Sequence, residues 1–552
     1  MFTTEMIQNL LHAQSNLFSA FDSKLKQDIS SGYSDYIQHQ IEDMQNSLFS
    51  FFSYCLQNPE KIQNAQANFL DDQKNILQDI LSNNKNKTQT QDKRFSHPLW
   101  NDQCFYQYIQ ASFLKLEKEI KNILRDIEQE EDTGYKTRFY VDQLLSALAP
   151  SNFPLTNPEI IEKTLKTQGD NFKHGLEKLK QSMEGASSFT SPFVLGKTIA
   201  TTEGSVVFKN ELIELIHYKP KNKKVYSKRL LIVPPWINKF YIFDLSPNNS
   251  LVHFLVQQGI DVYIISWLNP KSKEDNFSFE DYLNLGIISA ENFILTSTKA
   301  QKINLLGYCL GGVLVSSYLA ILGKKHEKIE SATLLATPLD FDKAGDLKIF
   351  STKENLDFLT PIIEKTGFLD GQILSNCFSV LKSKEMIWNN LVQEYMLNAD
   401  SHPIDFLHWN NDITNLPEKM YRFYIENFYI KNGFMNKGET KLHKKIVHLS
   451  KIHTPTFWAA AKNDHIAPYL STVSGINLIP GEKEFLLCES GHVAGMFNPP
   501  PAQKYGFWFD GNYQKGSWWC TWIDWLKPLS GDLVAVQYNQ GLYPAPGQYV
   551  KN

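Results

Sequence analysis

KINLLGYCLGGVLVSS, residues 302–317, is the stretch of this 552-residue chain that decides its fold. Residues 303–306 have the apolar character of a short buried strand, and the apolar run 313–322 has the length of a helix. Between them, Gly307 and Gly311 flank Cys309 in a Gly-x-Cys-x-Gly turn. The stretch therefore predicts a strand, a sharp turn with a thiol at its apex, and a helix.

A nucleophile at the apex of such a strand–turn–helix unit is the nucleophile elbow of α/β-hydrolase folds, here with a thiol as the nucleophile. The glycines are needed because side chains beside the apex would clash with the neighbouring strand and helix. The turn directs the Leu310 amide, at the helix N-terminus, toward a reacting carbonyl, which supplies half of an oxyanion hole. Cysteine is also common as a small buried hydrophobic residue, so its partners must decide between the two interpretations.

A nucleophilic thiol needs a base and an orienting carboxylate, and in this fold the chain order is nucleophile, acid, base. Asp464 follows an apolar run at 455–461, and His492 follows another at 485–487, so both stand in the expected order after strand ends. Asp340 and Asp342 also follow a strand, but we interpret them as capping or turn residues. The second oxyanion donor should be a backbone amide near Ile237 or Asn238, in the loop after an earlier strand.

Composition excludes several other functions. A net charge of −4 gives no support for nucleic-acid binding, and no run of about 18 apolar residues predicts a transmembrane span. The six cysteines have neither CxxC pairing nor zinc-site spacing, so we expect reduced thiols and no metal site. The first 21 residues include Glu5 and lack a continuous apolar core, so we expect no secretory signal there.

The chain divides by pattern into three parts. Residues 1–92 form a Gln/Asn-rich amphipathic helical segment with a linker, and residues 93–200 form a helical N-terminal domain. Residues 201–552 alternate apolar runs with helical patterns, which predicts a parallel sheet covered by helices on both faces. A cap or lid is expected as an insertion at about 340–450. The predicted fold is thus an α/β-hydrolase fold with a cap insertion after an all-helical N-terminal part.

Two aromatic groups leave alternatives open. The first group lies in the N-terminal segment and is either a helix–helix seam, which we favour, or a face for a hydrophobic particle: Leu48, Phe49, Phe51 and Phe52. The second lies in the cap and is either core or a seal against water: Trp388, Trp409, Phe423, Tyr424 and Phe428.

With the elbow and both loops identified, the chain resembles class I polyhydroxyalkanoate synthases from about Phe95 to about Pro528. The marks of this resemblance are long and contiguous: FSHPLW from Phe95, FVLGKTIATTEGSVVFKNELIELI from Phe193, LLIVPPWINKFYIFDLSPNNSL from Leu230, GYCLGG from Gly307, TPLDF from Thr337, HWNNDITNLP from His408, KNDHIAP from Lys462 and SGHVAGMFNPP from Ser490.

The resemblance implies that Cys309 carries the growing chain as a thioester and that His492 activates the thiol. Asp464 would hold His492 or help to activate the incoming 3-hydroxyl, and both roles stay open. The substrate would be (R)-3-hydroxyacyl-coenzyme A, chiefly 3-hydroxybutyryl-coenzyme A, with no cofactor beyond the coenzyme A released. The resemblance also implies a homodimer in the cytoplasm at the surface of polyester granules, with phasin-like partners.

Three residues are candidate contacts for substrate or coenzyme A: Tyr241, Lys382 and His465. At Lys382 the chain departs from the family, which usually has an arginine there; lysine keeps the charge and loses the bidentate fork. The elbow and its partners would equally serve a thiol-dependent thioesterase or polyester depolymerase, and the N-terminal helices alone would serve a granule scaffold.

Overall fold

The computed structural model describes residues 31–82, 90–130, 133–183, 192–399, 404–500, 504–538 and 541–551. The chain divides into two compact units. The first unit combines Met1–Thr190 with Phe378–His402, and the second combines Ser191–Cys377 with Pro403–Asn552. The predicted division at residues 92 and 200 therefore differs from the structural division, which falls near 190 and takes part of the cap insertion into the first unit.

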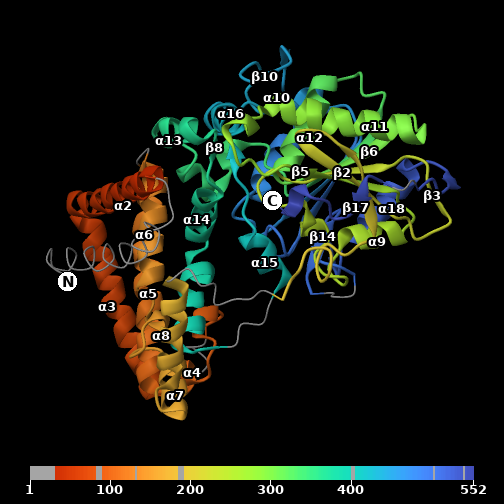
Figure 1. The fold of residues 1–552 in the computed structure, drawn as a ribbon. Helices are drawn as coiled ribbons and strands as arrows, with labels where there is room; N and C mark the ends of the chain where they lie inside the picture. The colour runs from red at the N-terminus through yellow and green to blue at the C-terminus, as the bar shows by residue number, and fades with distance from the viewer. Residues whose placement is uncertain are drawn as a thin grey trace. The chain divides into compact units, whose positions relative to one another are not determined.

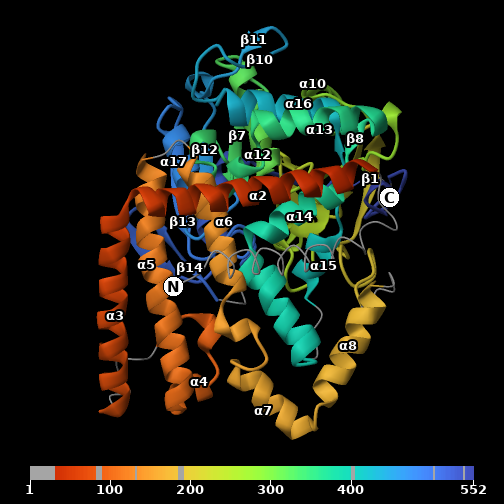
Figure 2. The same cartoon turned by 90° about the vertical axis from the view of Figure 1, so that its left-hand side faces the viewer.

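The first unit is helical, as predicted. Its helices are α2 (Ser31–Gln57), α3 (Pro59–Leu81), α4 (Leu99–Asp102), α5 (Cys104–Glu130), α6 (Gly134–Ala147), α7 (Pro158–Thr167) and α8 (Asp170–Met183). Helices α3 and α5 run side by side (Figure 2). Proline opens α7 at its first turn, where its missing N–H has no helical partner to lose.

The aromatic group of the N-terminal segment is interpreted as either a helix–helix seam or a face for a hydrophobic particle, and its members differ in burial. Leu48, Phe51 and Phe52 belong to a core cluster with Leu124 and Ile127, which supports the helix–helix seam. Phe49 is 74% exposed and does not contribute to that seam. The predicted amphipathic pattern at 6–21 lies outside the described residues.

Residues 384–396 return from the second half of the sequence to the helices of the first unit. They form the π-helical segments η9 (Lys384–Asn389) and η10 (Leu391–Met396). Val392 and Leu397 share a buried cluster with Ile160 of α7. A Cβ at Gly175 would lie 1.9 Å from the Tyr395 carbonyl oxygen, so only glycine allows α8 to approach this segment so closely.

The second unit is built on an eleven-stranded sheet of order β15-β14-β13-β12-β7-β6-β4-β5-β2-β1-β17. Its central strands are parallel: β4 (Leu230–Val233), β5 (Val262–Trp267), β6 (Ile303–Tyr308), β7 (Ile329–Leu335), β12 (Thr456–Ala461) and β13 (Lys483–Cys488). Three of them, β6, β12 and β13, coincide with the apolar runs at 303–306, 455–461 and 485–487. The outer strands pair antiparallel, so the sheet is mixed and the prediction of a parallel sheet was wrong at its edges: β1 (Gly204–Lys209), β2 (Ile213–Tyr218), β14 (Gly506–Phe509), β15 (Asn512–Lys515) and β17 (Tyr543–Pro544).

Helices cover both faces of this sheet. Figure 1 shows α11 (Ser289–Thr298) and α12 (Leu310–Leu322) above the strands, with α9 (Leu251–Gln257) and α18 (Trp519–Leu529) below them. The π-helical turn η6 (Tyr282–Ile288) joins α10 (Phe279–Asp281) to α11, and α17 (Tyr469–Ile476) precedes β13. A small antiparallel pair, β3 (Lys224–Tyr226) with β16 (Leu533–Ala535), lies outside the main sheet.

The cap insertion is mostly helical. It contains α13 (Lys353–Thr366), α14 (Gly371–Leu381), α15 (Asp405–Asn411), α16 (Glu418–Tyr424) and the π-helical η11 (Ile425–Ile430), with the short strands β8 (Phe368–Leu369), β9 (Leu416–Pro417), β10 (Lys441–Leu442) and β11 (Lys445–Ile446). Phe428 is fully buried, and its ring lies 5.6 Å from that of Phe279, at the start of α10. This packing supports the core interpretation for Phe428.

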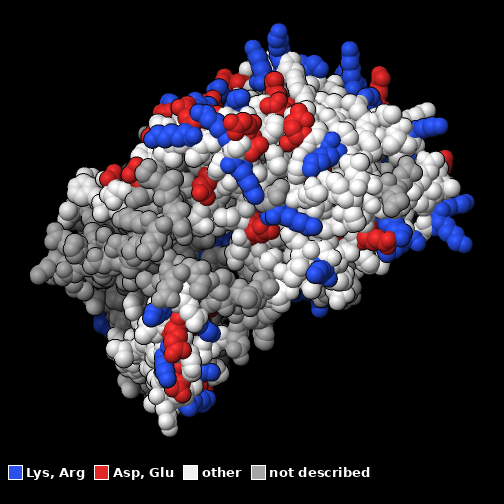
Figure 3. Space-filling model, viewed as in Figure 1, with Lys and Arg blue, Asp and Glu red and all other residues white. Residues whose placement is uncertain are grey.

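Acidic and basic side chains alternate over the part of the second unit that faces the viewer in Figure 3. Such mixing agrees with the small net charge of −4. Within the described residues, no helix combines the length and the apolar character that a membrane crossing needs.

Candidate active site

Cys309 occupies the strained apex between β6 and α12. Its backbone has φ 51° and ψ −116°, a region that side-chain-bearing residues rarely adopt. A Cβ at Gly311 would lie 2.0 Å from the Val233 carbonyl oxygen, and one at Gly312 would lie 1.9 Å from Thr337 Oγ1. The elbow therefore has the predicted geometry, and its glycines allow the helix to approach β4 and the loop after β7.

His492 and Asp464 form a short, buried pair. His492 Nδ1 lies 2.6 Å from Asp464 Oδ2, and the two side chains are 7% and 0% exposed. The backbone amides of Ile466 and Ala467 both donate to Asp464 Oδ1, each at 2.8 Å. Both oxygens of the carboxylate are thus occupied, and the acid loop is folded around its own side chain.

The second ring nitrogen of His492 is left for the thiol. Burial alone would lower the pKa of His492, but the charge of Asp464, and after it the interaction with Cys309, raises this pKa to about 10. The imidazole is consequently held in its protonated form at neutral pH. An imidazolium between a carboxylate and a sulfur atom is the arrangement that stabilises a thiolate nucleophile.

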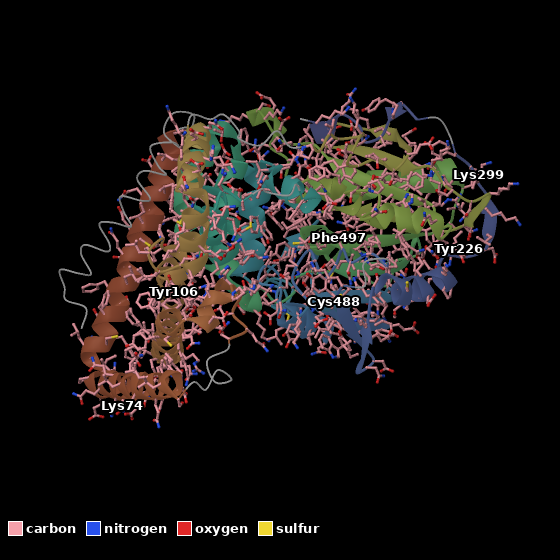
Figure 4. All side chains as sticks on the ribbon, turned by 90° about the horizontal axis from the view of Figure 1, so that it is seen from below. Lys74, Tyr106, Tyr226, Lys299, Cys488 and Phe497 are labelled. Carbon is pink, nitrogen blue, oxygen red and sulfur yellow. The ribbon has the colours of Figure 1, made fainter. Side chains whose placement is uncertain are left out.

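Tyr308 and Phe497 hold the imidazole from the side. The Tyr308 ring lies 5.2 Å from the His492 ring, and its hydroxyl donates to the His492 carbonyl oxygen at 3.4 Å. Phe497, labelled in Figure 4, packs edge-on against Tyr308 at 5.2 Å. Burial raises the pKa of Tyr308 well above its ordinary value, so this hydroxyl stays a hydrogen-bond donor.

The loop after β4 offers one of its two predicted amides. Asn238 has φ 66°, and its backbone N–H donates to Thr414 Oγ1 at 2.8 Å. This bond engages the Asn238 amide, which leaves Ile237 as the candidate from this loop. The other candidate, Leu310, is the first residue of α12, where the helix has no carbonyl partner for the amide.

The three predicted substrate contacts lie in different places. Tyr241 is fully buried and donates to Asp412 Oδ2 at 2.8 Å, while Lys239 pairs with the other oxygen of Asp412 at 2.7 Å. Tyr241 therefore anchors the β4 loop to the cap. His465 is exposed beside Asp464, and Lys382 belongs to the first unit; their contacts with coenzyme A stay predictions.

Sequence reasoning gave no site role to Tyr429 and left Tyr424 between core and seal. Both are buried on α16 and η11, and their ring centroids lie 5.4 Å apart. Burial is the main cause that raises the pKa of each hydroxyl, and the charge of Cys309 adds to it. Both hydroxyls therefore lie close enough to Cys309 for its charge to affect their pKa values. Nothing in the sequence pattern of the cap distinguishes these two tyrosines from its other aromatic residues.

The described residues contain no candidate metal site. No group of three or more His, Cys, Asp and Glu side chains there is arranged to hold an ion. What the arrangement supplies is a thiol, a charged imidazole with its carboxylate, and backbone amides, which together are the groups needed for acyl transfer through a covalent intermediate.

Comparisons with known proteins agree with this chemistry. Residues 91–255 match the family described as the poly-beta-hydroxybutyrate polymerase (PhaC) N-terminus, and residues 229–499 match the alpha/beta hydrolase fold. A poly(3-hydroxyalkanoate) polymerase of Methylorubrum extorquens is 37% identical over 490 residues, which cover 83% of this chain and 80% of that protein. The poly(3-hydroxyalkanoate) polymerase subunit PhaC of Rhizobium meliloti is 34% identical over 551 residues, covering 94% and 90%. The corresponding subunit of Cupriavidus necator is 33% identical over 488 residues, covering 83% of each.

Proposed function

The chain belongs to the poly(3-hydroxyalkanoate) polymerase family, and from this membership we propose that it polymerises (R)-3-hydroxyacyl-coenzyme A, chiefly 3-hydroxybutyryl-coenzyme A. The reaction is an acyl transfer that releases coenzyme A and forms a polyester. The observation that carries the proposal is the buried Asp464–His492 pair beside Cys309, with the pKa of His492 raised to about 10.

In the first step the Cys309 thiolate attacks the thioester carbonyl of the substrate. The bond from the carbonyl carbon to the Cys309 sulfur forms, and the bond to the sulfur of coenzyme A breaks. The imidazolium of His492 gives its proton to the leaving coenzyme A thiolate. One thioester replaces another, so the acyl group keeps the reactivity that the next step needs.

In the second step the 3-hydroxyl of an incoming substrate attacks the Cys309 thioester. His492, now neutral, takes the hydroxyl proton, an ester bond forms, and the Cys309 thiolate is released. The lengthened chain still ends in a coenzyme A thioester, which Cys309 then attacks. Asp464 orients His492 in both steps, because its Oδ2 is bound to the ring and its Oδ1 is held by two amides of its own loop.

The negative charge that develops on the carbonyl oxygen is stabilised by the amides of Leu310 and Ile237. Competing hydrolysis is limited by the apolar wall beside the loop after β4. The Trp236 ring is 3% exposed and meets the Tyr424 ring edge-on at 5.6 Å. Fixed aromatic surfaces of this kind exclude water from a reacting thioester.

The direct test is incubation with 3-hydroxybutyryl-coenzyme A, in which the released coenzyme A thiol is quantified and the sedimented polymer is weighed. The wild type is expected to give both, without free 3-hydroxybutyrate. Cys309→Ala is expected to give neither, and Cys520→Ala, which changes an exposed cysteine on α18, should behave as the wild type.

Two results would contradict the proposal. Polymer made by Cys309→Ala would remove the thiol from the mechanism. Free acid appearing at the rate of coenzyme A release, without any pellet, would make the protein a thiol-dependent thioesterase or depolymerase on the same fold.

The setting of this reaction is part of the same proposal. We place the protein in the cytoplasm, as a homodimer at the surface of polyester granules, with phasin-like proteins as neighbours. Family membership and the exposed apolar side chains of α2, such as Phe49 and Leu56, support this setting.

A further inference from the structure

The last residues of the chain form a short tail that closes around one buried carboxylate. Glu214, in β2, has a fully buried side chain. Its Oε1 accepts from the Tyr543 hydroxyl at 2.6 Å, and its Oε2 accepts from the amides of Gln548 and Tyr549 at 2.8 and 3.1 Å. The tail therefore supplies three donors to this carboxylate, whose one ion pair among the described residues is with Lys209 at 3.5 Å.

The tail is shaped to this carboxylate. Gly547 has φ 89°, and a Cβ there would lie 2.3 Å from Glu214 Oε2, so the turn requires glycine. Tyr543 pairs with Val206 of β1 and adds β17 to the edge of the sheet. The Tyr549 hydroxyl donates to the Asn210 carbonyl oxygen at 2.6 Å. A buried carboxyl group with this many hydrogen-bond donors fixes the tail in one position.

Beyond Glu214 the tail reaches the loop that carries the Ile237 amide. Val550 is 1% exposed and belongs to the core cluster of Phe240 and Tyr241. A small hollow is lined by both segments: Trp236, Asn238, Lys239 and Phe240 from the loop, and Tyr549 and Val550 from the tail, together with the end of β5 and Thr414. The same loop begins against the elbow, since a Cβ at Gly311 would also lie 2.6 Å from the Pro234 carbonyl oxygen.

We propose that the tail 543–551, held by Glu214, is a positioning element for the oxyanion loop 234–240. The tail supports the loop at Val550, Thr414 holds the Asn238 amide, and the elbow bounds the start of the loop at Gly311. The Ile237 amide is thereby fixed at one place relative to Cys309. Glu214 and Val550 are positioning residues in this account, and the inference rests on the proposed acyl transfer at Cys309.

The position of an oxyanion donor matters because it must match the transition state more closely than the ground state. A small displacement of the loop should consequently lower the rate of acyl transfer while leaving substrate binding almost unchanged. The reactivity of the Cys309 thiol depends on His492 and Asp464 and should not change. These two expectations separate a positioning role from a general loss of structure.

The test compares the full-length wild type with Glu214→Gln and Val550→Ala. Glu214→Gln keeps the side-chain shape but removes one acceptor atom, and Val550→Ala removes only packing. For both variants we expect a fall in kcat for coenzyme A release of about 10-fold, with KM within about twofold of the wild type. Hydrogen exchange in residues 234–240 should accelerate, and the rate of Cys309 alkylation by iodoacetamide should stay the same.

Glu203→Gln is the matched control, because Glu203 precedes β1 and pairs only with the exposed Lys219 among the contacts described for it. It should leave all four readouts at their wild-type values. Wild-type kcat in both tail variants, or unchanged exchange in the loop, would overturn the inference. Alkylation of Cys309 that slows in parallel with kcat would also overturn it, because the tail would then support the whole site. A wild type that releases coenzyme A without polymer would refute the proposed function instead, while its release rates still decide the role of the tail.

Discussion

Asp464 accepts three hydrogen bonds through two oxygens, and these bonds indicate which role the residue has. Its Oδ1 is bound by two amides of its own loop, and its Oδ2 is bound by His492. The loop thus fixes the carboxylate, and the carboxylate fixes the ring. Of the two roles that the sequence left open, orientation of His492 is the one that this bonding favours.

Removal of the Asp464 charge tests that role. In Asp464→Asn the first cause that raises the pKa of His492 is lost, and the ring can adopt the wrong tautomer. We expect kcat for coenzyme A release to fall about 10²-fold, less than in a serine enzyme because a thiol ionises more readily than a hydroxyl. Asp342→Asn, at a carboxylate that is 63% exposed, is the control and should stay close to the wild type. A wild-type rate in Asp464→Asn would assign the orienting role to another residue.

The same pair makes stability depend on pH. The folded state raises the pKa of His492 from 6.5 to about 10, so it binds this proton more tightly than the unfolded state does. The resulting stability is fully present below about pH 6.5 and is lost as the pH rises through about 10. We expect the melting temperature of the wild type to fall more across this window than that of Asp464→Asn. Equal falls in the two proteins, measured by thermal denaturation in matched buffers, would contradict the assignment.

At the scale of elements, the strands that could be recognised in the sequence are those whose side chains are apolar on both faces of the sheet. The central strands are buried throughout, and apolar runs such as Leu230–Val233 and Thr456–Ala461 are typical of parallel strands. The outer antiparallel strands lack this signal: β15 is exposed along its whole length, and β2, although buried throughout, interrupts its apolar residues with Glu214 and His217. Glu214 is buried only because a tail more than 300 positions later in the chain supplies its donors, which no local pattern predicts.

Some residues of the candidate site could be predicted from local sequence and others could not. Cys309, Asp464 and His492 could be predicted because each follows the end of a strand within a few residues. Thr414 and the tyrosines of α16 and η11 could not, because the cap brings them to the loop and the sulfur from over 100 positions away, through contacts made only in three dimensions.

Thr414 tests how the β4 loop and the cap depend on one another. Thr414→Val keeps the shape of the side chain but leaves the half-buried Asn238 amide without its acceptor. This should lower the free energy of unfolding by about 1–3 kcal/mol, measured by denaturant unfolding. The rate of coenzyme A release should fall with it, because the neighbouring Ile237 amide shifts. Thr414→Ser retains the hydroxyl and should keep most of the stability and rate; a loss in Thr414→Ser without a loss in Thr414→Val would show that the methyl group, not the hydrogen bond, matters.

At the scale of the whole molecule, α2 contributes to two different surfaces. One side of α2 packs with α5 through Leu48 and Leu124. Another side exposes Phe49 and Leu56, which are 74% and 83% exposed. Deletion of residues 1–92 would remove both surfaces together, so point substitutions separate them better.

Phe49→Glu combined with Leu56→Glu places charge only on the exposed side. If this side contacts polyester granules, the double variant should sediment with purified granules several-fold less than the wild type, because burying a charge against an apolar surface is unfavourable. Its melting temperature should be unchanged, since neither side chain is buried. Lys74→Glu, an exposed change on α3, is the matched control. Wild-type sedimentation of the double variant would remove α2 from granule binding.

The return of residues 384–396 to the first unit has a consequence for synthesis on the ribosome. Ile160 leaves the exit tunnel long before Val392 and Leu397, the residues that complete its buried cluster. At about 5–20 residues per second, the delay is on the order of ten to fifty seconds. Throughout that interval the nascent N-terminal helices carry an uncovered apolar surface at Ile160. Synonymous codons that slow translation between 160 and 400 should therefore raise the aggregated fraction.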